Sequence, residues 1–464
     1  MAQIIIWNSF DTGKDPRAAS SHSHGSAVRP LGAHAICSWL VKNGYDAIVI
    51  DFCSMLTTQQ LIDITQKNID STTVAIGISC TFISNWSWVH AAKSVLSSKY
   101  PKLEWIYGGN VDRVPVGVKI FRGLSEDSIV KYMDEKTNKK LLRIPYDIQT
   151  ETGTYHNAKG ITKDEVLSIQ MGRGCQFKCK FCSYPLIGKK KGTYIRDYKF
   201  VEQEFLANYE RFGVTRYTIT DDTVNESLEK VIALAEIAQR LPFKLEWVGY
   251  NRLDLIWSNP ETIELLEISG LRGAFFGIES FHPQASKLVG KGWNGKYAKD
   301  FLLELKEKWG GRVTWQLGFI VGLGEETLQD VIDTSRWCIE NRMFSWCWNG
   351  LMIRSSVYEE TAHYKSEFDL NHDKYGYRIL SNSGWKSDTW TSEQAYITSQ
   401  NLNIMSETTG VRKLSCFSLS ELAPVGYSFD YLMTLPLWEP NFLEEYRKKL
   451  DLFMSDYVNY QLNL

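Results

Sequence analysis

The chain has 464 residues and a formal net charge of −2, with 44% hydrophobic and 23% charged residues. This length predicts two or three compact units, and the near-neutral charge argues against a nucleic-acid partner. No apolar run approaches the roughly 20 residues that cross a bilayer, and the first residues, MAQIIIWNSF, lack the basic start of a signal peptide. Nine cysteines without a secretory signal indicate a reducing compartment, so we expect a cytoplasmic protein without membrane contact.

Residues 1–130 alternate strand and helix patterns, which predicts a doubly wound parallel sheet with helices on both faces. In chain order, the expected elements are strand 4–6, helix 31–44, strand 46–50, helix 57–68, strand 74–78, helix 86–100 and strand 103–107. Ligands of such sheets bind at the carboxyl ends of the strands. The loops 8–30, 79–86 and 108–112 are therefore candidate binding segments.

Residues 131–165 are polar and irregular, and we expect them to connect two domains. Strand and helix patterns alternate again over residues 166–355. The expected strands are 167–171, 217–222, 245–250, 273–280, 314–322 and 347–353. Six β/α units predict a partial barrel whose chemistry lies at the carboxyl ends of its strands.

The segment GRGCQFKCKFC places Cys175, Cys179 and Cys182 on one loop directly after the first of these strands. Isolated cysteines are commonly buried thiols, but three within eight residues indicate a metal or cluster site. A structural zinc ion takes four protein ligands, and the nearest histidines, His156 and His282, are distant in sequence. Three thiolates on a four-iron cluster leave one iron open for chemistry. An ordinary thiol role and a zinc site remain the alternatives.

This C-x3-C-x2-C loop in a β/α repeat resembles the radical S-adenosylmethionine (SAM) superfamily. The resemblance implies that the three cysteines hold a [4Fe–4S] cluster and that the open iron chelates SAM. It also implies SAM contacts at the strand ends. The residues that occupy those positions are Phe181, Asp221, Asp222, Arg252, Glu279, Gly322 and Asn349. Two further acidic residues, Glu325 and Glu326, lie at a helix start, where interaction with the helix dipole explains them without a function.

Residues 1–130 resemble the cobalamin-binding domain that precedes the radical SAM barrel in one subfamily. The resemblance implies that Ser79, Thr81, Gly108 and Gly109 lie along the nucleotide tail of cobalamin. The D-x-H-x-x-G motif of that domain, whose histidine binds cobalt, is missing, although the stretch 20–26, SSHSHGS, carries two histidines in the corresponding loop. The domain is expected either to bind cobalamin without a histidine ligand or to act only as a scaffold.

Residues 356–464 carry little information. Helices are expected at 392–407 and 441–462 and a loop at 415–428, which gives a mainly helical region. The family resemblance implies that this region closes the barrel and shapes the substrate pocket. Cys416 is its single cysteine, which argues against a second cluster.

The expected reaction is reductive cleavage of SAM to a 5′-deoxyadenosyl radical, followed by functionalisation of an unactivated carbon, with cobalamin-dependent methyl transfer as the first hypothesis. The alternatives are a cobalamin-independent rearrangement or ring formation, a transfer-RNA-modifying enzyme, and a non-catalytic cluster- or zinc-binding protein. The expected partners are a small-molecule or peptide substrate and an electron donor such as flavodoxin or ferredoxin. The sequence identifies neither a catalytic residue nor the substrate.

Overall fold

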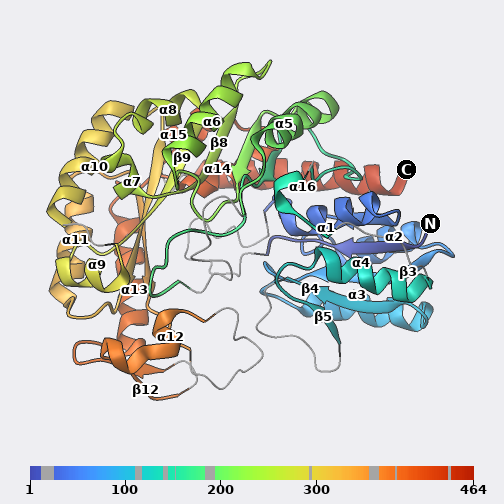
Figure 1. Cartoon of the computed structure of the whole chain (residues 1–464), viewed down its shortest axis with the longest axis horizontal. Helices are drawn as coiled ribbons and strands as arrows, with labels where there is room; N and C mark the ends of the chain where they lie inside the picture. Colours follow the sequence, from blue (N-terminus) through green and yellow to red (C-terminus); the bar gives the residue numbers. More distant parts are fainter. Residues whose placement is uncertain are drawn as a thin grey trace.

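The protein consists of two parallel sheets, each flanked by helices, and a helical C-terminal region (Figure 1). The computed structural model describes residues 1–11, 26–109, 118–138, 145–151, 153–182, 194–291, 295–354, 365–381, 384–436 and 440–463. The two histidines of the loop 20–26 lie outside the described residues.

The first domain is a doubly wound parallel sheet of strand order β2-β1-β3-β4-β5, as the sequence predicts. Its strands are β1 (Gln3–Trp7), β2 (Asp46–Ile50), β3 (Thr73–Ser79), β4 (Glu104–Gly108) and the unpredicted β5 (Lys119–Phe121). Its helices are α1 (Leu31–Lys42), α2 (Thr58–Asn68), α3 (Ser87–Lys99) and α4 (Glu126–Thr137). Helices α1 and α4 cover one face and α2 and α3 the other, which explains why the strands are apolar on both sides.

The second domain is a six-stranded parallel sheet in the order β11-β10-β9-β8-β7-β6, which confirms the partial (β/α)6 barrel. Its strands are β6 (Val166–Ile169), β7 (Arg216–Ile219), β8 (Glu246–Asn251), β9 (Leu271–Glu279), β10 (Thr314–Val321) and β11 (Ser345–Gly350). The helices around it are α5 (Tyr198–Phe212), α6 (Leu228–Arg240), α7 (Leu253–Ser258), α8 (Thr262–Ile268), α9 (Pro283–Val289), α10 (Gly295–Trp309) and α11 (Leu328–Glu340). A short 3-10 turn, Ile148–Thr150, lies in the segment before β6.

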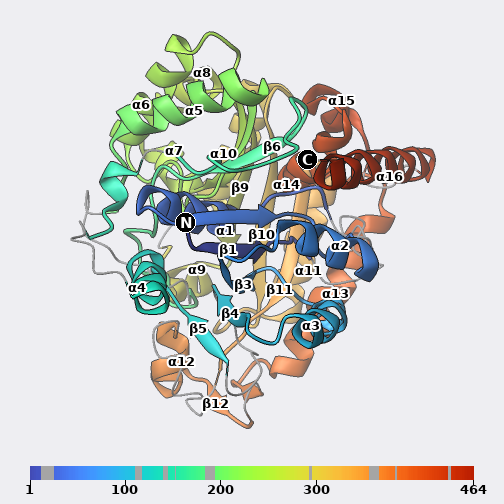
Figure 2. The ribbon, with the colours of Figure 1, turned by 90° about the vertical axis from the view of Figure 1, so that its right-hand side faces the viewer.

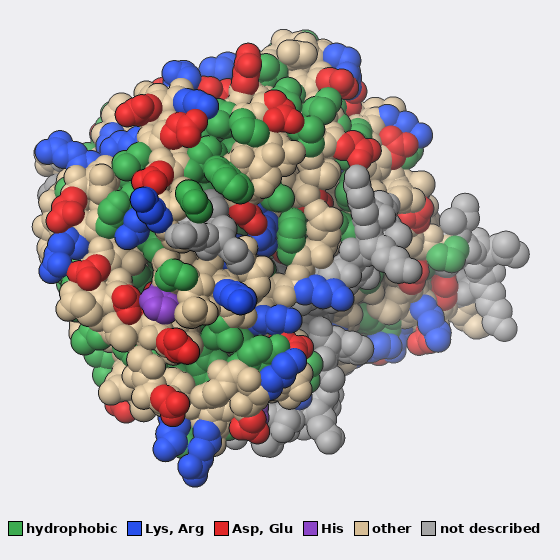
Figure 3. Space-filling model, turned by 60° about the vertical axis from the view of Figure 1, so that its left-hand side comes forward, with side chains coloured by type: hydrophobic (Ala, Val, Ile, Leu, Met, Phe, Trp, Pro, Cys, Tyr) green, Lys and Arg blue, Asp and Glu red, His purple; other side chains and the backbone are tan. Residues whose placement is uncertain are grey.

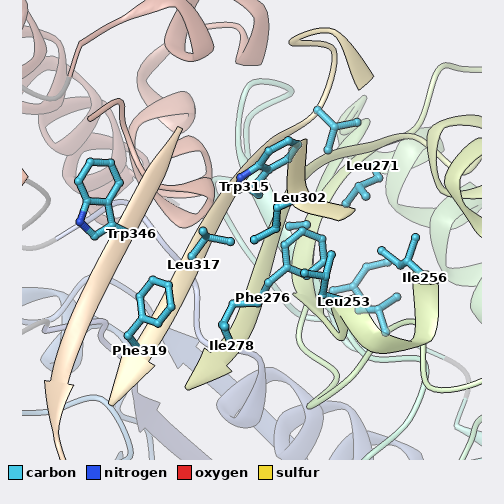
Figure 4. Close-up of a cluster of buried hydrophobic side chains, with 14 of the residues drawn as sticks. Leu253, Ile256, Leu271, Phe276, Ile278, Leu302, Trp315, Leu317, Phe319 and Trp346 are labelled. Atoms are coloured by element: carbon cyan, nitrogen blue, oxygen red, sulfur yellow. The ribbon is translucent and has the colours of Figure 1, made fainter. Parts of the chain in front are cut away.

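The barrel core lies between the strands and the outer helices (Figure 4). Trp315, Leu317 and Phe319 alternate along β10 and share one face, because successive strand residues point to opposite sides. They pack toward Leu302 of α10 and Phe276 of β9. Every residue of β10 is buried, so its other face must also be covered.

The C-terminal region covers that other face and is mainly helical, as expected. Its elements are α12 (Glu367–Asn371), the 3-10 turn His372–Tyr375, β12 (Arg378–Ile379), β13 (Trp385–Lys386), α13 (Ser392–Thr408), α14 (Cys416–Leu422), the 3-10 turn Ala423–Val425, α15 (Phe429–Thr434) and α16 (Pro440–Asn463). The expected loop at 415–428 is wrong, since α14 occupies its first half and packs on β8, β9 and β10. Helix α16 reaches across to α2 of the first domain (Figure 2).

A buried ionic cluster lies where the two domains and α16 contact one another. The Arg29 guanidinium lies 2.5 Å from an Asp51 carboxylate oxygen and 2.6 Å from one of Glu165, and all three side chains are 1% exposed. The other Asp51 oxygen lies 3.0 Å from Nε2 of His34. The backbone N–H of Asp51 donates to the hydroxyl of Tyr457 at 2.9 Å. The buried charges at the domain interface are therefore paired only when the segments that carry Arg29, Asp51 and Glu165 are packed together.

On the face shown in Figure 3, side chains of both charge signs are interspersed with hydrophobic ones. None of the described helices has the length and apolar composition to cross a membrane.

Candidate functional site

The cysteine loop follows β6 and lies at the carboxyl end of the barrel strands. Cys175 is buried, whereas Cys179 and Cys182 are partly exposed. The Cys182 N–H donates to the carbonyl of Cys179 at 3.1 Å, so these two residues share a tight turn. The Lys180 N–H donates to the carbonyl of Val289 at 3.1 Å, which anchors the loop to the end of α9.

Two polar groups lie against the thiols. The hydroxyl of Thr223 is 3.4 Å from Sγ of Cys175, and Nη1 of Arg252 is 3.6 Å from Sγ of Cys179. The Arg252 guanidinium also stacks over the ring of Phe177, 4.0 Å from its centroid. The cation beside Cys179 favours its thiolate, which is the form that binds metal. Burial raises the pKa of Cys175, and the Thr223 hydroxyl donates to the carbonyl of Asp222 at 2.8 Å. Among the described residues, no group of three or more His, Cys, Asp or Glu side chains could hold a single metal ion. The donor set, three thiols spread along one loop, instead fits a broad iron–sulfur cluster.

Of the two predicted acidic residues after β7, Asp221 is engaged inside the protein. One of its oxygens accepts from the Met171 N–H at 2.7 Å, and the other lies 2.5 Å from Nζ of Lys230. Lys230 also pairs with Glu226 at 2.8 Å, and the Tyr194 hydroxyl donates to Glu226 at 2.5 Å. This buried network supports the backbone that leads into the cysteine loop.

Asp222 instead faces an open cavity. Burial, together with the neighbouring charge of Asp221, raises the pKa of Asp222 to about 6. An acidic side chain in this setting is stabilised by a cation. Asp222 is therefore better placed than Asp221 to contact the ammonium of a bound amino acid.

At the end of β9, Glu279 forms an ion pair with Lys291 at 3.5 Å, and the Arg252 guanidinium beside the cysteine loop pairs with Asp254 at 2.6 Å. Burial raises the pKa of Glu279, while the positive charges of Lys291 and Arg252 oppose that rise. Glu279 has a φ of 66°, a left-handed conformation that costs roughly 1–3 kcal/mol in a non-glycine residue and occurs most often at functional sites. Arg252 thus contacts Cys179, and its positive charge also acts on Glu279.

The remaining predicted SAM contacts have separate settings. Phe181 is partly buried against the barrel core. Gly322 has a φ of 103°, and a Cβ there would lie 2.7 Å from the ring of Trp385, so the glycine admits a tryptophan from the C-terminal region. Asn349 is exposed on β11, while its neighbour Trp348 is bound through its backbone by Asn403 of α13.

A cavity of about 650 Å³ runs between the two domains. It begins on the apolar face of the first sheet and ends at α14 and at Gly172, Arg173 and Gly174, which directly precede Cys175. This size is typical of small-molecule sites. All four residues predicted to contact cobalamin line it: Ser79, Thr81, Gly108 and Gly109. The φ of Gly109 is 108°, and a Cβ there would lie 2.4 Å from the hydroxyl of Thr81, so this close approach requires glycine. The largely apolar lining and the tight glycine turn fit a large cofactor that spans both domains.

Helix α14 forms a part of this cavity that the sequence did not predict. Phe417, Ser420 and Glu421 line it together with Tyr250 of β8. Ser415 caps α14 by accepting a hydrogen bond from the N–H of Ser418, and this serine followed by apolar residues at helical spacing was the signal available in the sequence.

Residues 169–338 match the model of the family "Radical SAM superfamily". The chain is 26% identical over 171 residues to an uncharacterized methyltransferase of Pyrococcus horikoshii, covering 36% of either chain. It is 24% identical over 230 residues to bacteriochlorophyllide d C-12(1)-methyltransferase of Chlorobaculum tepidum, covering 49% of this chain and 48% of the relative. The matched regions thus span about half the length of these curated relatives or less.

Two solved structures align over most of the chain. The cobalamin-dependent SAM radical enzyme OxsB, with aqua-cobalamin and SAM bound, gives a TM-score of 0.56 at 15% identity, covering 81% of this chain and 56% of OxsB. The radical SAM methyltransferase TsrM of Kitasatospora setae, with tryptophan and a SAM analogue bound, gives 0.57 at 15% identity, covering 84% and 79%. At this identity the likeness establishes the fold. Residues 169–338 are therefore a radical SAM domain, within a chain that has the overall fold of cobalamin-dependent radical SAM enzymes.

Proposed function

We propose that this protein is a cobalamin-dependent radical SAM methyltransferase that acts on a small-molecule or peptide substrate. The observation that carries the proposal is a cavity lined both by the four candidate cobalamin contacts and by Gly172, Arg173 and Gly174, which directly precede Cys175. A domain that served only as a scaffold would not require an apolar cavity that opens toward the barrel. The relatives and the two solved structures carry methyltransferase or cobalamin-dependent radical chemistry in their own descriptions, which supports the same reaction class.

Each predicted residue then has a defined task. Cys175, Cys179 and Cys182 hold the [4Fe–4S] cluster, and Arg252 stabilises the thiolate of Cys179. When bound, the cluster supplies one electron to SAM and cobalamin supplies a transferable methyl group. The electron comes from a small redox protein such as flavodoxin or ferredoxin.

The strand-end residues bind and orient SAM. Asp222 faces the cavity and suits its ammonium group. Arg252 lies beside Cys179, where its guanidinium, paired on one side with Asp254, suits the carboxylate. Glu279 is held beside Arg252 and Lys291 and contributes a second acidic group at the next strand end. On the other domain, the turn formed by Thr81 and Gly109 leaves room for the cofactor tail. The apolar walls between these groups exclude water from the reacting carbon.

The test is anaerobic reconstitution with iron, sulfide and hydroxocobalamin, followed by desalting and ultraviolet–visible spectroscopy. We expect stoichiometric corrin bands beside an iron–sulfur shoulder. Cysteine-to-alanine substitution at 175, 179 and 182 should abolish the shoulder, whereas the matched variant Cys338→Ala, in the barrel core, should keep it. A shoulder without corrin would contradict methyl transfer and leave a cobalamin-independent conversion. Loss of both signals in the wild-type chain would contradict the radical SAM assignment of the cysteines.

A further inference from the structure

Helix α14 forms one wall of the cavity, and its position is fixed by contacts inside the barrel. Gly273 of β9 permits the approach, because a Cβ there would lie 2.9 Å from Cβ of Cys416. The hydroxyl of Thr218 on β7 donates to that of Ser420 at 2.8 Å. These contacts fix the position of α14 and therefore of the next residue, Glu421.

The Glu421 carboxyl lines the cavity without a hydrogen bond or ion pair to its side chain from any described residue. Burial alone raises its pKa to about 8. Next to it, the rings of Tyr250 and Phe417 lie 4.8 Å apart and form an aromatic wall of the same cavity. The Glu421 side chain is partly exposed to the cavity, so a ligand there can supply the partner that its carboxyl lacks in the described structure.

The charges around the cavity favour a cation. Within the described residues that line it, the charged side chains are Glu126, Arg173, Asp222 and Glu421. Arg173 forms an ion pair with Glu126, so these two charges cancel. Asp222 and Glu421 remain, and Asp222 lies at the SAM end, beside the cysteine loop. A positive group from a different molecule would therefore stabilise the charged form of Glu421.

We propose that Glu421 binds a protonated nitrogen of the substrate, whose aromatic or apolar body lies against Tyr250 and Phe417. This inference rests on the proposed function, because it assigns the first-domain part of the cavity to cobalamin and the α14 part to the substrate. The substrate class is thus an amine with an aromatic or apolar body. An ammonium–carboxylate hydrogen bond in a site shielded from water is stronger than a neutral one and selects the charged ligand.

The test compares two probes of matching shape, tryptamine and tryptophol, which differ by an ammonium in place of a hydroxyl. Isothermal titration calorimetry is performed on the full chain loaded with cluster and hydroxocobalamin. We expect the wild-type protein to bind tryptamine about 10-fold more tightly than tryptophol, as one additional charge-assisted hydrogen bond implies. Glu421→Gln should reduce this ratio to about one. The matched control Glu444→Gln removes an exposed carboxylate of α16 and should leave the ratio unchanged.

Charge reversal gives a second, independent measurement. Glu421→Lys should transfer the preference from tryptamine to indole-3-propionate. Corrin content and 5′-deoxyadenosine formation are measured on the same samples, so a failure of the proposed function is distinguished from a failure of this inference. Equal binding of the two probes by the wild-type chain would overturn the inference. So would loss of corrin with an unchanged probe ratio in Glu421→Gln, because Glu421 would then serve the cobalamin amides.

Discussion

The adjacent residues Glu325 and Glu326 give a matched pair for testing how burial controls a carboxyl group. Glu325 is exposed, whereas Glu326 is 1% exposed and lies outside the helix that the sequence assigned to it. One Glu326 oxygen accepts from the Ser280 hydroxyl at 2.5 Å, and within the described structure the other has no hydrogen-bond partner. Burial raises the pKa of Glu326 from 4.5 to about 8.

This shift predicts that Glu326→Gln stabilises the protein increasingly as the pH rises. In the folded chain Glu326 keeps its proton up to about pH 8, whereas in the unfolded chain it loses the proton near pH 4.5. The unfolded state therefore binds fewer protons between these values, and the stability of the wild-type chain falls with pH. The slope reaches about 1.4 kcal/mol per pH unit midway between the two pKa values and is smaller near each of them, so the difference between pH 5 and pH 8 is roughly 3.5 kcal/mol.

Urea unfolding at pH 5, 6, 7 and 8, followed by tryptophan fluorescence, measures this difference. We expect the free energies of unfolding of Glu326→Gln and the wild type to diverge steadily over this range. Glu325→Gln should follow the wild type at every pH, because its carboxyl is exposed. A difference between Glu326→Gln and the wild type that does not change with pH would refute the reasoning.

Two further predictions follow from the contacts described above. Asp51→Asn removes the carboxylate that pairs with the buried Arg29 guanidinium. We expect the free energy of unfolding, measured by urea titration, to fall by about 3–5 kcal/mol. A loss below about 1 kcal/mol would contradict the role of the ion pair. Gly109→Ala places a Cβ 2.4 Å from the Thr81 hydroxyl, so it should deplete bound corrin without changing the iron content. Gly44→Ala is its control, since that glycine also has a positive φ but no atom within 4 Å of the added Cβ.

Local patterns in the sequence predicted both sheets and the cysteine loop. The apolar strands and the C-x3-C-x2-C spacing are encoded by neighbouring residues, so no knowledge of distant contacts was needed. The strands β6 and β7 end earlier than predicted, because the chain turns into loops after Ile169 and Ile219.

Apart from the helix α14 itself, whose Ser415 cap is a local signal, the missed features depend on contacts between distant segments. The burial of Glu326 results from contacts with Ser280 and Trp390. The Ser280 hydroxyl bonds to the Glu326 carboxylate, and the indole N–H of Trp390 donates to the backbone carbonyl of Glu326. The place of Trp385 depends on the absence of a side chain at Gly322. Likewise, Glu421 becomes a cavity residue only because α14 enters the barrel.

The ionic cluster between the domains also affects the order in which the protein folds during synthesis. The hydroxyl that satisfies the backbone of Asp51 belongs to Tyr457, 406 residues later in the chain. Residues up to Tyr457 must therefore be synthesised before the first domain can complete its hydrogen bonding. Until then, the charges of Arg29 and Asp51 lack part of their final surroundings. The first domain thus reaches its final form only after a segment from the C-terminal region has been made and has packed against it.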